Sequence, residues 1–95
     1  MNYTITQIQQ SATPILKRYD VKKAAIFGSY ARNEQHRDSD IDMLVEFQGK
    51  KSYFDLVDLE LELQESIGKK FDCITYKSIH PLLRTRILKE QKPIL

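Results

Sequence analysis

The sequence has few of the residues that cross-link a chain or break its regular structure: one cysteine, three glycines, three prolines and no tryptophan among 95 residues. A lone Cys73 has no partner for an internal disulfide, which excludes a disulfide-rich extracellular scaffold and favours a reducing compartment. With 29% charged and 41% hydrophobic residues, the composition is that of a folded protein and excludes disorder or collagen-like repeats. The length leaves no room for a second core, so we expect one domain over residues 1–95.

Long apolar runs are missing as well. The run at 24–27 is only a few residues long, whereas a membrane span needs roughly 18. The first ten residues also lack the basic flank and apolar core of a secretion signal. We therefore expect a cytoplasmic protein without membrane association.

Positive charge is concentrated at one end of the chain. Residues 69–95 contain seven Lys or Arg and two acidic residues, whereas residues 1–68 contain eight Lys or Arg and eleven acidic residues. A basic end of this kind suits nucleotide phosphates, RNA or an acidic partner, and a solvated helix face is the simpler explanation.

Apolar periodicity predicts alternating helices and strands. Helices are expected at 6–19, capped by Thr4 or Thr6, at 52–67, capped by Ser52 and ended by Gly68, and at 80–89, with a short helix after Gly28. Strands are expected at 23–27, 41–47 and 70–76, the first of them central, with a short edge strand near the end. This order predicts an α/β fold, a small sheet flanked by helices. The apolar positions expected to face inward are Ile8, Ala12, Ile15, Leu16 and Tyr19 in the first helix; Phe54, Leu56, Val57, Leu59, Leu61, Leu63 and Ile67 in the second; and Leu82, Leu83, Ile87 and Leu88 in the last.

The strand at 41–47 carries acids on one face only. Alternation turns one set of its side chains, which includes Ile41 and Met43, to the core and places Asp40 and Asp42 together on the other face. Asp72, near the start of the next strand, can join them. Three neighbouring carboxylates repel one another unless a cation or hydrogen bonds neutralise them. Oxygen ligands of this type suit Mg²⁺, which substrate phosphates usually help to coordinate.

Gly28 and Ser29 supply the complement to these acids. A strand that ends in a glycine turn and opens a helix presents backbone N–H groups to an anion, and the serine hydroxyl can donate too. A phosphate-binding turn opposite a metal site is the outline of a phosphoryl-transfer site. Each part has a simpler explanation by itself, because glycine commonly ends strands, serine caps helices, and an Asp-x-Asp pair is frequent in surface loops. The combination and spacing favour a site.

The stretch from Gly28-Ser29 to "SDID", Ser39 to Asp42, resembles the nucleotidyltransferase superfamily related to DNA polymerase beta. "GSYAR" and "DMLVEF" are similar to the minimal nucleotidyltransferases called MNT, and "GKKFDCIT" resembles the family segment with the third carboxylate. In length and element order the resemblance covers nearly the whole chain. One departure is Asn33, where relatives usually have glycine, but Asn tolerates the same left-handed backbone.

The resemblance implies a role for each of these residues. Asp40, Asp42 and Asp72 would be the catalytic carboxylates and the ligands of two Mg²⁺ ions. Gly28, Ser29, Arg32 and Ser39 would bind ATP, although Arg32 can equally pair with Asp38 or Asp40 or lie solvated. His36 is expected to be exposed rather than a metal ligand.

The resemblance also implies a partner and a reaction. Minimal nucleotidyltransferases are known chiefly as antitoxins of HEPN-domain RNase toxins, so the chain is expected to transfer AMP from ATP to a tyrosine hydroxyl of such a toxin in a hetero-oligomeric complex, without binding nucleic acid itself. Two alternatives stay open: an antitoxin that neutralises its partner by occlusion without catalysis, and a small-molecule nucleotidyltransferase. A glycosyltransferase is disfavoured by length, and a P-loop is excluded because no Gly-Lys-Ser/Thr follows Gly28. The base preference, the acceptor, the number of nucleotides transferred and the stoichiometry are not encoded in a recognisable pattern.

Overall fold

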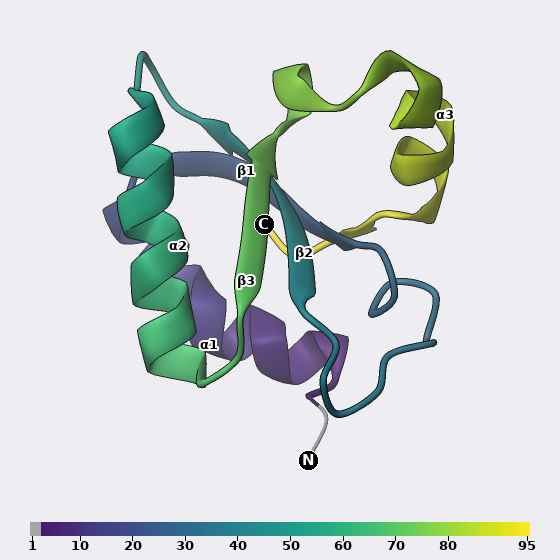
Figure 1. Cartoon of the computed structure of the whole chain (residues 1–95). Coiled ribbons are helices and arrows are strands. Elements are labelled where there is room, and N and C mark those ends of the chain that lie inside the picture. Colours follow the sequence, from purple (N-terminus) through teal and green to yellow (C-terminus); the bar gives the residue numbers. More distant parts are fainter. Residues whose placement is uncertain (1–2) are drawn as a thin grey trace.

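The computed structural model describes residues 3–95. Along the chain lie α1 (Ile5–Arg18), β1 (Val21–Phe27), β2 (Ile41–Phe47), α2 (Tyr53–Ile67), β3 (Phe71–Thr75), the 3₁₀ turn η1 (Tyr76–Ser78), α3 (Pro81–Glu90) and β4 (Lys92–Pro93) (Figure 1). The strands form one sheet in the order β3-β2-β1-β4. β1 is antiparallel to β2 and β4, and β2 is parallel to β3, which confirms a small mixed α/β sheet with β1 inside it and the last strand at its edge.

The sheet has one thickly covered face and one thinly covered face. α1 and α2 contribute to the main core, together with alternate residues of the strands (Figure 1). On the other face a small second cluster joins Leu44 of β2 to Ile79 and to Ile87 of α3. Leu44, which shares the mostly acidic face of β2 with Asp42 as the alternation predicts, is fully buried in this second cluster.

Capping side chains place the helix ends where the sequence predicts them. The Thr4 hydroxyl accepts a hydrogen bond from the Gln7 N–H at 3.1 Å, and the Gln7 side chain accepts one from the Thr4 N–H at 2.9 Å, so two N–H groups at the start of α1 are satisfied. Ser52 and Asp55 form the equivalent pair at the start of α2. Gly68 ends α2 in the left-handed conformation, at φ 79°.

The apolar stripes of two helices are narrower than predicted. In α2 the side chains of Leu59, Leu63 and Ile67 are buried, but Phe54 and Leu61 are 76% and 55% exposed. At about 100° per residue, the buried positions share one side of the helix and the two exposed positions lie on the opposite side. A sheet covers only one side of a helix, so the prediction that Phe54 and Leu61 face inward is wrong.

The last helix departs from its predicted orientation in the same way. Ile87 is buried, whereas Leu82 is 86% exposed and Leu83 is 47% exposed. α3 thus buries little apolar surface against the sheet and leaves its remaining faces to solvent and to a cavity described below. Within residues 3–95, no helix combines the length and apolar character that a membrane crossing requires.

Candidate active site

The segment after β1 is a tight turn, and the short helix predicted there is wrong. The Arg32 N–H donates to the Gly28 carbonyl at 3.1 Å, and the Glu34 N–H donates to the Ser29 carbonyl at 2.9 Å. These bonds close a single turn over 28–33, and Asn33, at φ 57°, then takes the chain out of helical geometry. The expected left-handed tolerance of Asn33 is confirmed, and Tyr30 holds the turn down by packing its ring in the main core.

Gly28 lies directly against one of the predicted catalytic acids. Its φ of +75° favours glycine, and a Cβ built on it would overlap the Asp42 carboxylate and lie 3.1 Å from the carboxylate carbon. The close approach follows from the antiparallel register, which pairs Phe27 with Asp42. The glycine turn and the acidic end of β2 are therefore one local structure.

The structure brings the three predicted carboxylates into neighbouring positions. Asp40 immediately precedes β2, Asp42 is in it, and Asp72 is the Cα partner of Asp42 in the parallel β2–β3 pair. Paired residues of parallel strands place their side chains on the same face of a sheet. Burial, followed by the negative charges of Asp72 and Asp40, raises the pKa of Asp42 to about 6.

This electrostatic strain fits a divalent cation. A cation beside Asp42 would offset the repulsion, and a donor set of carboxylate oxygens is the kind that Mg²⁺ prefers. In the part of the chain that the structure describes, no group of three or more His, Cys, Asp or Glu side chains is arranged to hold a metal ion. The assignment of Asp40, Asp42 and Asp72 as metal ligands thus stays a prediction, supported by their placement and chemistry.

The turn and the acids line one open cavity of about 510 Å³. Its first wall consists of Gly28, Ser29, Asp40 and Asp42. The loop between β1 and β2 adds Arg32, His36 and Ser39; the side chain of His36 is exposed, as expected, and the Ser39 hydroxyl accepts a hydrogen bond from the His36 N–H at 2.9 Å. Asp72 is not among the lining residues. The cavity is the natural place for a ligand that carries both phosphates and a metal ion.

The third wall comes from α3, where the sequence carries no motif that indicates a site. Leu83, Arg86, Ile87 and Glu90 line the same cavity as the predicted catalytic acids. The sequence offered only the excess of positive charge after residue 69 as a signal. Arg86 and Glu90 are four residues apart, a spacing that by itself indicates an ordinary stabilising pair on a helix surface.

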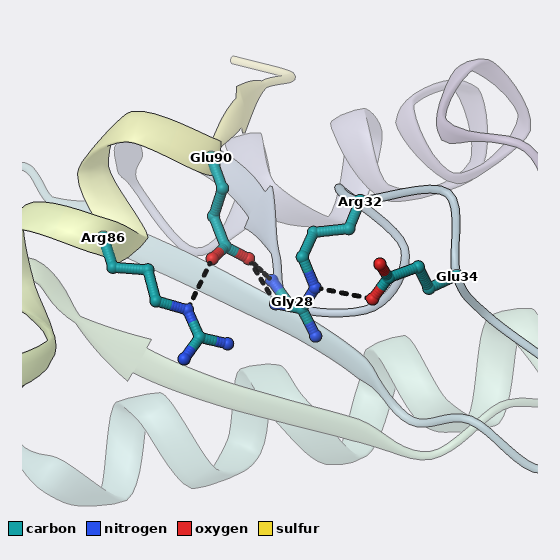
Figure 2. Close-up of polar contacts among 5 residues, drawn as sticks. All are labelled: Gly28, Arg32, Glu34, Arg86 and Glu90. Atoms are coloured by element: carbon teal, nitrogen blue, oxygen red, sulfur yellow. Dashed lines mark hydrogen bonds and ion pairs between the residues drawn. The ribbon is translucent and has the colours of Figure 1, made fainter.

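Glu90 joins α3 to the glycine turn (Figure 2). Its Oε2 accepts hydrogen bonds from the Gly28 N–H at 2.8 Å and from Arg32 Nη1 at 2.8 Å, while its Oε1 accepts one from Arg86 Nε at 3.4 Å. Only 13% of the Glu90 side chain is exposed. The backbone donor that was expected to face phosphate is therefore engaged by a carboxylate of the chain itself.

Arg32 is paired differently from the expectation. It contacts Glu90, and its Nε donates to Glu34 at 2.9 Å (Figure 2). Of the alternatives considered for Arg32, the pairing with Asp38 or Asp40 is not the one observed, because the turn over 28–33 directs the guanidinium toward Glu34 and α3. Arg32 still lines the cavity, with most of its charge compensated by two acids.

Comparison with known proteins agrees with the geometry of this site. A family described as "Polymerase beta, Nucleotidyltransferase" matches residues 10–95. A Methanocaldococcus jannaschii protein named "Putative protein adenylyltransferase MJ0435" is 56% identical over 91 residues, which cover 96% of this chain and 98% of that relative. A solved structure of a "putative minimal nucleotidyltransferase" has a TM-score of 0.78 at 30% identity, over 90% of this chain and 87% of that one.

Two more distant structures share the fold. A toxin–antitoxin crystal structure with AMP-PNP has a TM-score of 0.80 at 21% identity, covering 92% of this chain and 72% of that one. A tri-AMPylated Shewanella oneidensis HEPN toxin in complex with MNT antitoxin contains a chain with a TM-score of 0.73 at 16% identity, with coverage of 95% and 71%. The family match, the close relative and the shared fold lead to one conclusion: the chain belongs to the polymerase beta nucleotidyltransferase family and is a minimal nucleotidyltransferase.

Proposed function

We propose that this nucleotidyltransferase is a Mg²⁺-dependent protein adenylyltransferase, which transfers AMP from ATP to a tyrosine hydroxyl of a HEPN-domain RNase toxin and so acts as its antitoxin in the cytoplasm. The observation that carries the proposal is the shared cavity of the Gly28-Ser29 turn and the Asp40–Asp42 pair. Relatives named as adenylyltransferases, and toxin–antitoxin complexes of the same fold, support the choice of reaction and partner.

Asp40, Asp42 and Asp72 are assigned as the carboxylates that hold the metal. When bound, two Mg²⁺ ions would neutralise phosphate charge and make the attacking hydroxyl easier to deprotonate. Asp40 and Asp42 orient the α-phosphate from the acidic wall of the cavity. Asp72, on the neighbouring strand, is assigned to the side of the acceptor hydroxyl.

The glycine turn is assigned to the phosphates. Ser29 and Ser39 offer hydroxyl donors on the cavity wall, and Gly28 keeps the turn close enough to Asp42 for metal and phosphate to be held together. In the transfer, the tyrosine oxygen forms a bond to the α-phosphorus as the bond to the β-phosphate breaks. Pyrophosphate leaves with that bonding pair, and the proton of the hydroxyl passes to solvent or to a carboxylate.

The cavity is open to solvent, which suits an acceptor delivered by a second protein. The test incubates the purified chain with Mg²⁺, α-labelled ATP and the HEPN-domain protein encoded beside it. We expect label on the partner, and no label when γ-labelled ATP is used, because the γ-phosphate leaves in pyrophosphate. The partner's RNase activity should fall as the label appears.

Asp40→Asn and Asp42→Asn remove the proposed metal ligands, and Asp58→Asn, on the exposed side of α2, is the matched control. Loss of label in the first two variants and its retention in the third would support catalysis by this site. Absence of label from the wild type, with a stable complex and full inhibition of the RNase, would replace the proposal by neutralisation through occlusion. Label on a small molecule alone would replace the proposal by a small-molecule nucleotidyltransferase.

A further inference from the structure

The cavity has two arginines, and their charges are compensated to different degrees. Arg32 contacts two carboxylates, Glu34 at 2.9 Å and Glu90 at 2.8 Å. Arg86 contacts only Glu90 among residues 3–95, through Nε, at the longer distance of 3.4 Å. A carboxylate close to an arginine weakens the positive potential that the arginine presents to a ligand. Arg86 therefore keeps more positive potential for a bound anion than Arg32 does.

The donors of Arg86 are also less occupied. Its Nη1 and Nη2 groups have no hydrogen-bond or ion-pair partner in the described part of the chain, and Figure 2 shows them on the side of the guanidinium away from Glu90. The side chain is 67% exposed and lines the cavity together with Ser29 and Asp42. A guanidinium with two adjacent free nitrogens matches two oxygens of one phosphate group.

Glu90 holds this guanidinium at the edge of the phosphate site. One carboxylate accepts a hydrogen bond from Arg86 through one oxygen and from the Gly28 N–H through the other, so a single functional group separates the arginine from the glycine turn. Because Glu90 is mostly buried and fixed by three donors, it restricts the directions in which the long Arg86 side chain can point.

We propose that Arg86 binds the terminal phosphates of the nucleotide and that Glu90 positions it, so that α3 forms the second half of the triphosphate site. The inference rests on the proposed function, since it assumes that ATP occupies this cavity. It also reassigns the arginine of the site: Arg32 fixes the turn through Glu34 and Glu90, and Arg86 contacts the ligand.

The experiment measures the affinity of the whole chain for Mg²⁺-ATP and for AMP by titration calorimetry. Arg86→Ala is compared with Arg84→Ala, which removes the same side chain from the same helix at a position outside the cavity, where the guanidinium donates to the Tyr76 carbonyl. Arg86→Gln serves as a second variant that keeps much of the side-chain length. Thermal melting confirms that all variants fold, as the exposure of Arg86 leads us to expect.

We expect both Arg86 variants to bind ATP about tenfold more weakly than wild type, in line with the loss of a charge-assisted hydrogen bond to phosphate. The affinity for AMP, which lacks the terminal phosphates, should fall much less. An equal loss for ATP and AMP would overturn the assignment in favour of a structural role, and so would ATP binding indistinguishable from that of Arg84→Ala. Wild-type protein that binds no ATP would instead overturn the proposed function itself.

Discussion

The two faces of the sheet differ in what covers them, and the difference separates stability from chemistry. Alternate residues of β2, namely Ile41, Met43 and Val45, are fully buried on the face that packs against α1 and α2. On the opposite face of the same strand, Leu44 lies in a small cluster under α3, while Asp42 is only half-buried at the cavity. A strand seven residues long thus takes part both in the core and in the site, because its side chains alternate.

The thin covering of the second face has a functional consequence. A helix that packed tightly over Asp42 would exclude ligand, and a bare face would lack the third wall of the cavity. α3 adopts an intermediate arrangement: Ile87 is buried, Leu83 and Arg86 line the cavity, and Glu90 ties the helix to the glycine turn. Polar contacts hold α3 in place where apolar burial is small.

The largest loss of stability is expected from a substitution in the core between the sheet and α1 and α2. Leu63→Ala removes a fully buried side chain of α2 and should lower the free energy of unfolding by about 3 kcal/mol. Leu61→Ala, two residues away on the exposed side of the same helix, should change it by less than about 0.5 kcal/mol. Urea denaturation measures both. Similar losses in the two variants would contradict the division of α2 into a buried and an exposed side.

The thick face is also the part of the molecule that the sequence predicts best. The 3.6-residue spacing of Ile8, Ala12 and Ile15, the caps at Thr4 and Ser52, and the stop at Gly68 are local signals, and each leads to the element that it indicates. The predicted stripes of two helices are too wide, because periodicity shows which residues are apolar and not how much of a helix a sheet can cover.

On the thinly covered face, only the part of the site formed by residues close together in the sequence was predictable. Gly28, Ser29, Asp40 and Asp42 lie within 15 positions of one another, so their sequence pattern could be interpreted as one site. The contacts of Glu90 with Gly28 and Arg32 join residues 62 and 58 positions apart. No periodicity or motif encodes such a pairing. It arises because β4 returns beside β1 and brings the end of α3 to the glycine turn.

An intermediate effect is expected where the turn meets the acids. Gly28→Ala should lower the free energy of unfolding by about 2 kcal/mol, for two reasons. The new Cβ clashes with the Asp42 carboxylate, and the alanine backbone is strained at a positive φ. Gly68→Ala is the matched control, with nearly the same φ, +79°, and open space around the Cβ, and should cost about 1 kcal/mol. Denaturation gives the difference between them.

The same two glycine variants, compared in the transfer assay, distinguish a loss of activity at the site from a general loss of stability. Gly28→Ala should abolish labelling of the partner, since the clash displaces either the turn or Asp42. Gly68→Ala should retain it, because Gly68 does not line the cavity and a Cβ there would have no atom within 4 Å. Equal stability losses with full labelling in both variants would show that the Asp42 carboxylate moves aside without consequence, and would weaken its assignment as a metal ligand.

The stability effect expected from Asp42→Asn is opposite in sign. The pKa of Asp42 is raised from an ordinary 3.8 to about 6, so the folded chain binds this proton more tightly than the unfolded chain does. Wild-type stability therefore falls as the pH rises from about 4 to about 6, and the loss is complete above that range. The asparagine side chain carries no charge, so Asp42→Asn should melt at a higher temperature than wild type at neutral pH without divalent ions.

Melting curves across this pH range, with and without Mg²⁺, test whether the charge of Asp42 lowers the stability of the chain and whether metal binding restores it. The gap between Asp42→Asn and wild type should close toward a pH of about 4 and below, where Asp42 becomes protonated in both states of the wild type. Mg²⁺ should raise the melting temperature of the wild type and not that of the variant, because ligand that binds only the folded state stabilises it. A gap that persists unchanged under these acidic conditions would attribute the variant's stability to packing and not to charge.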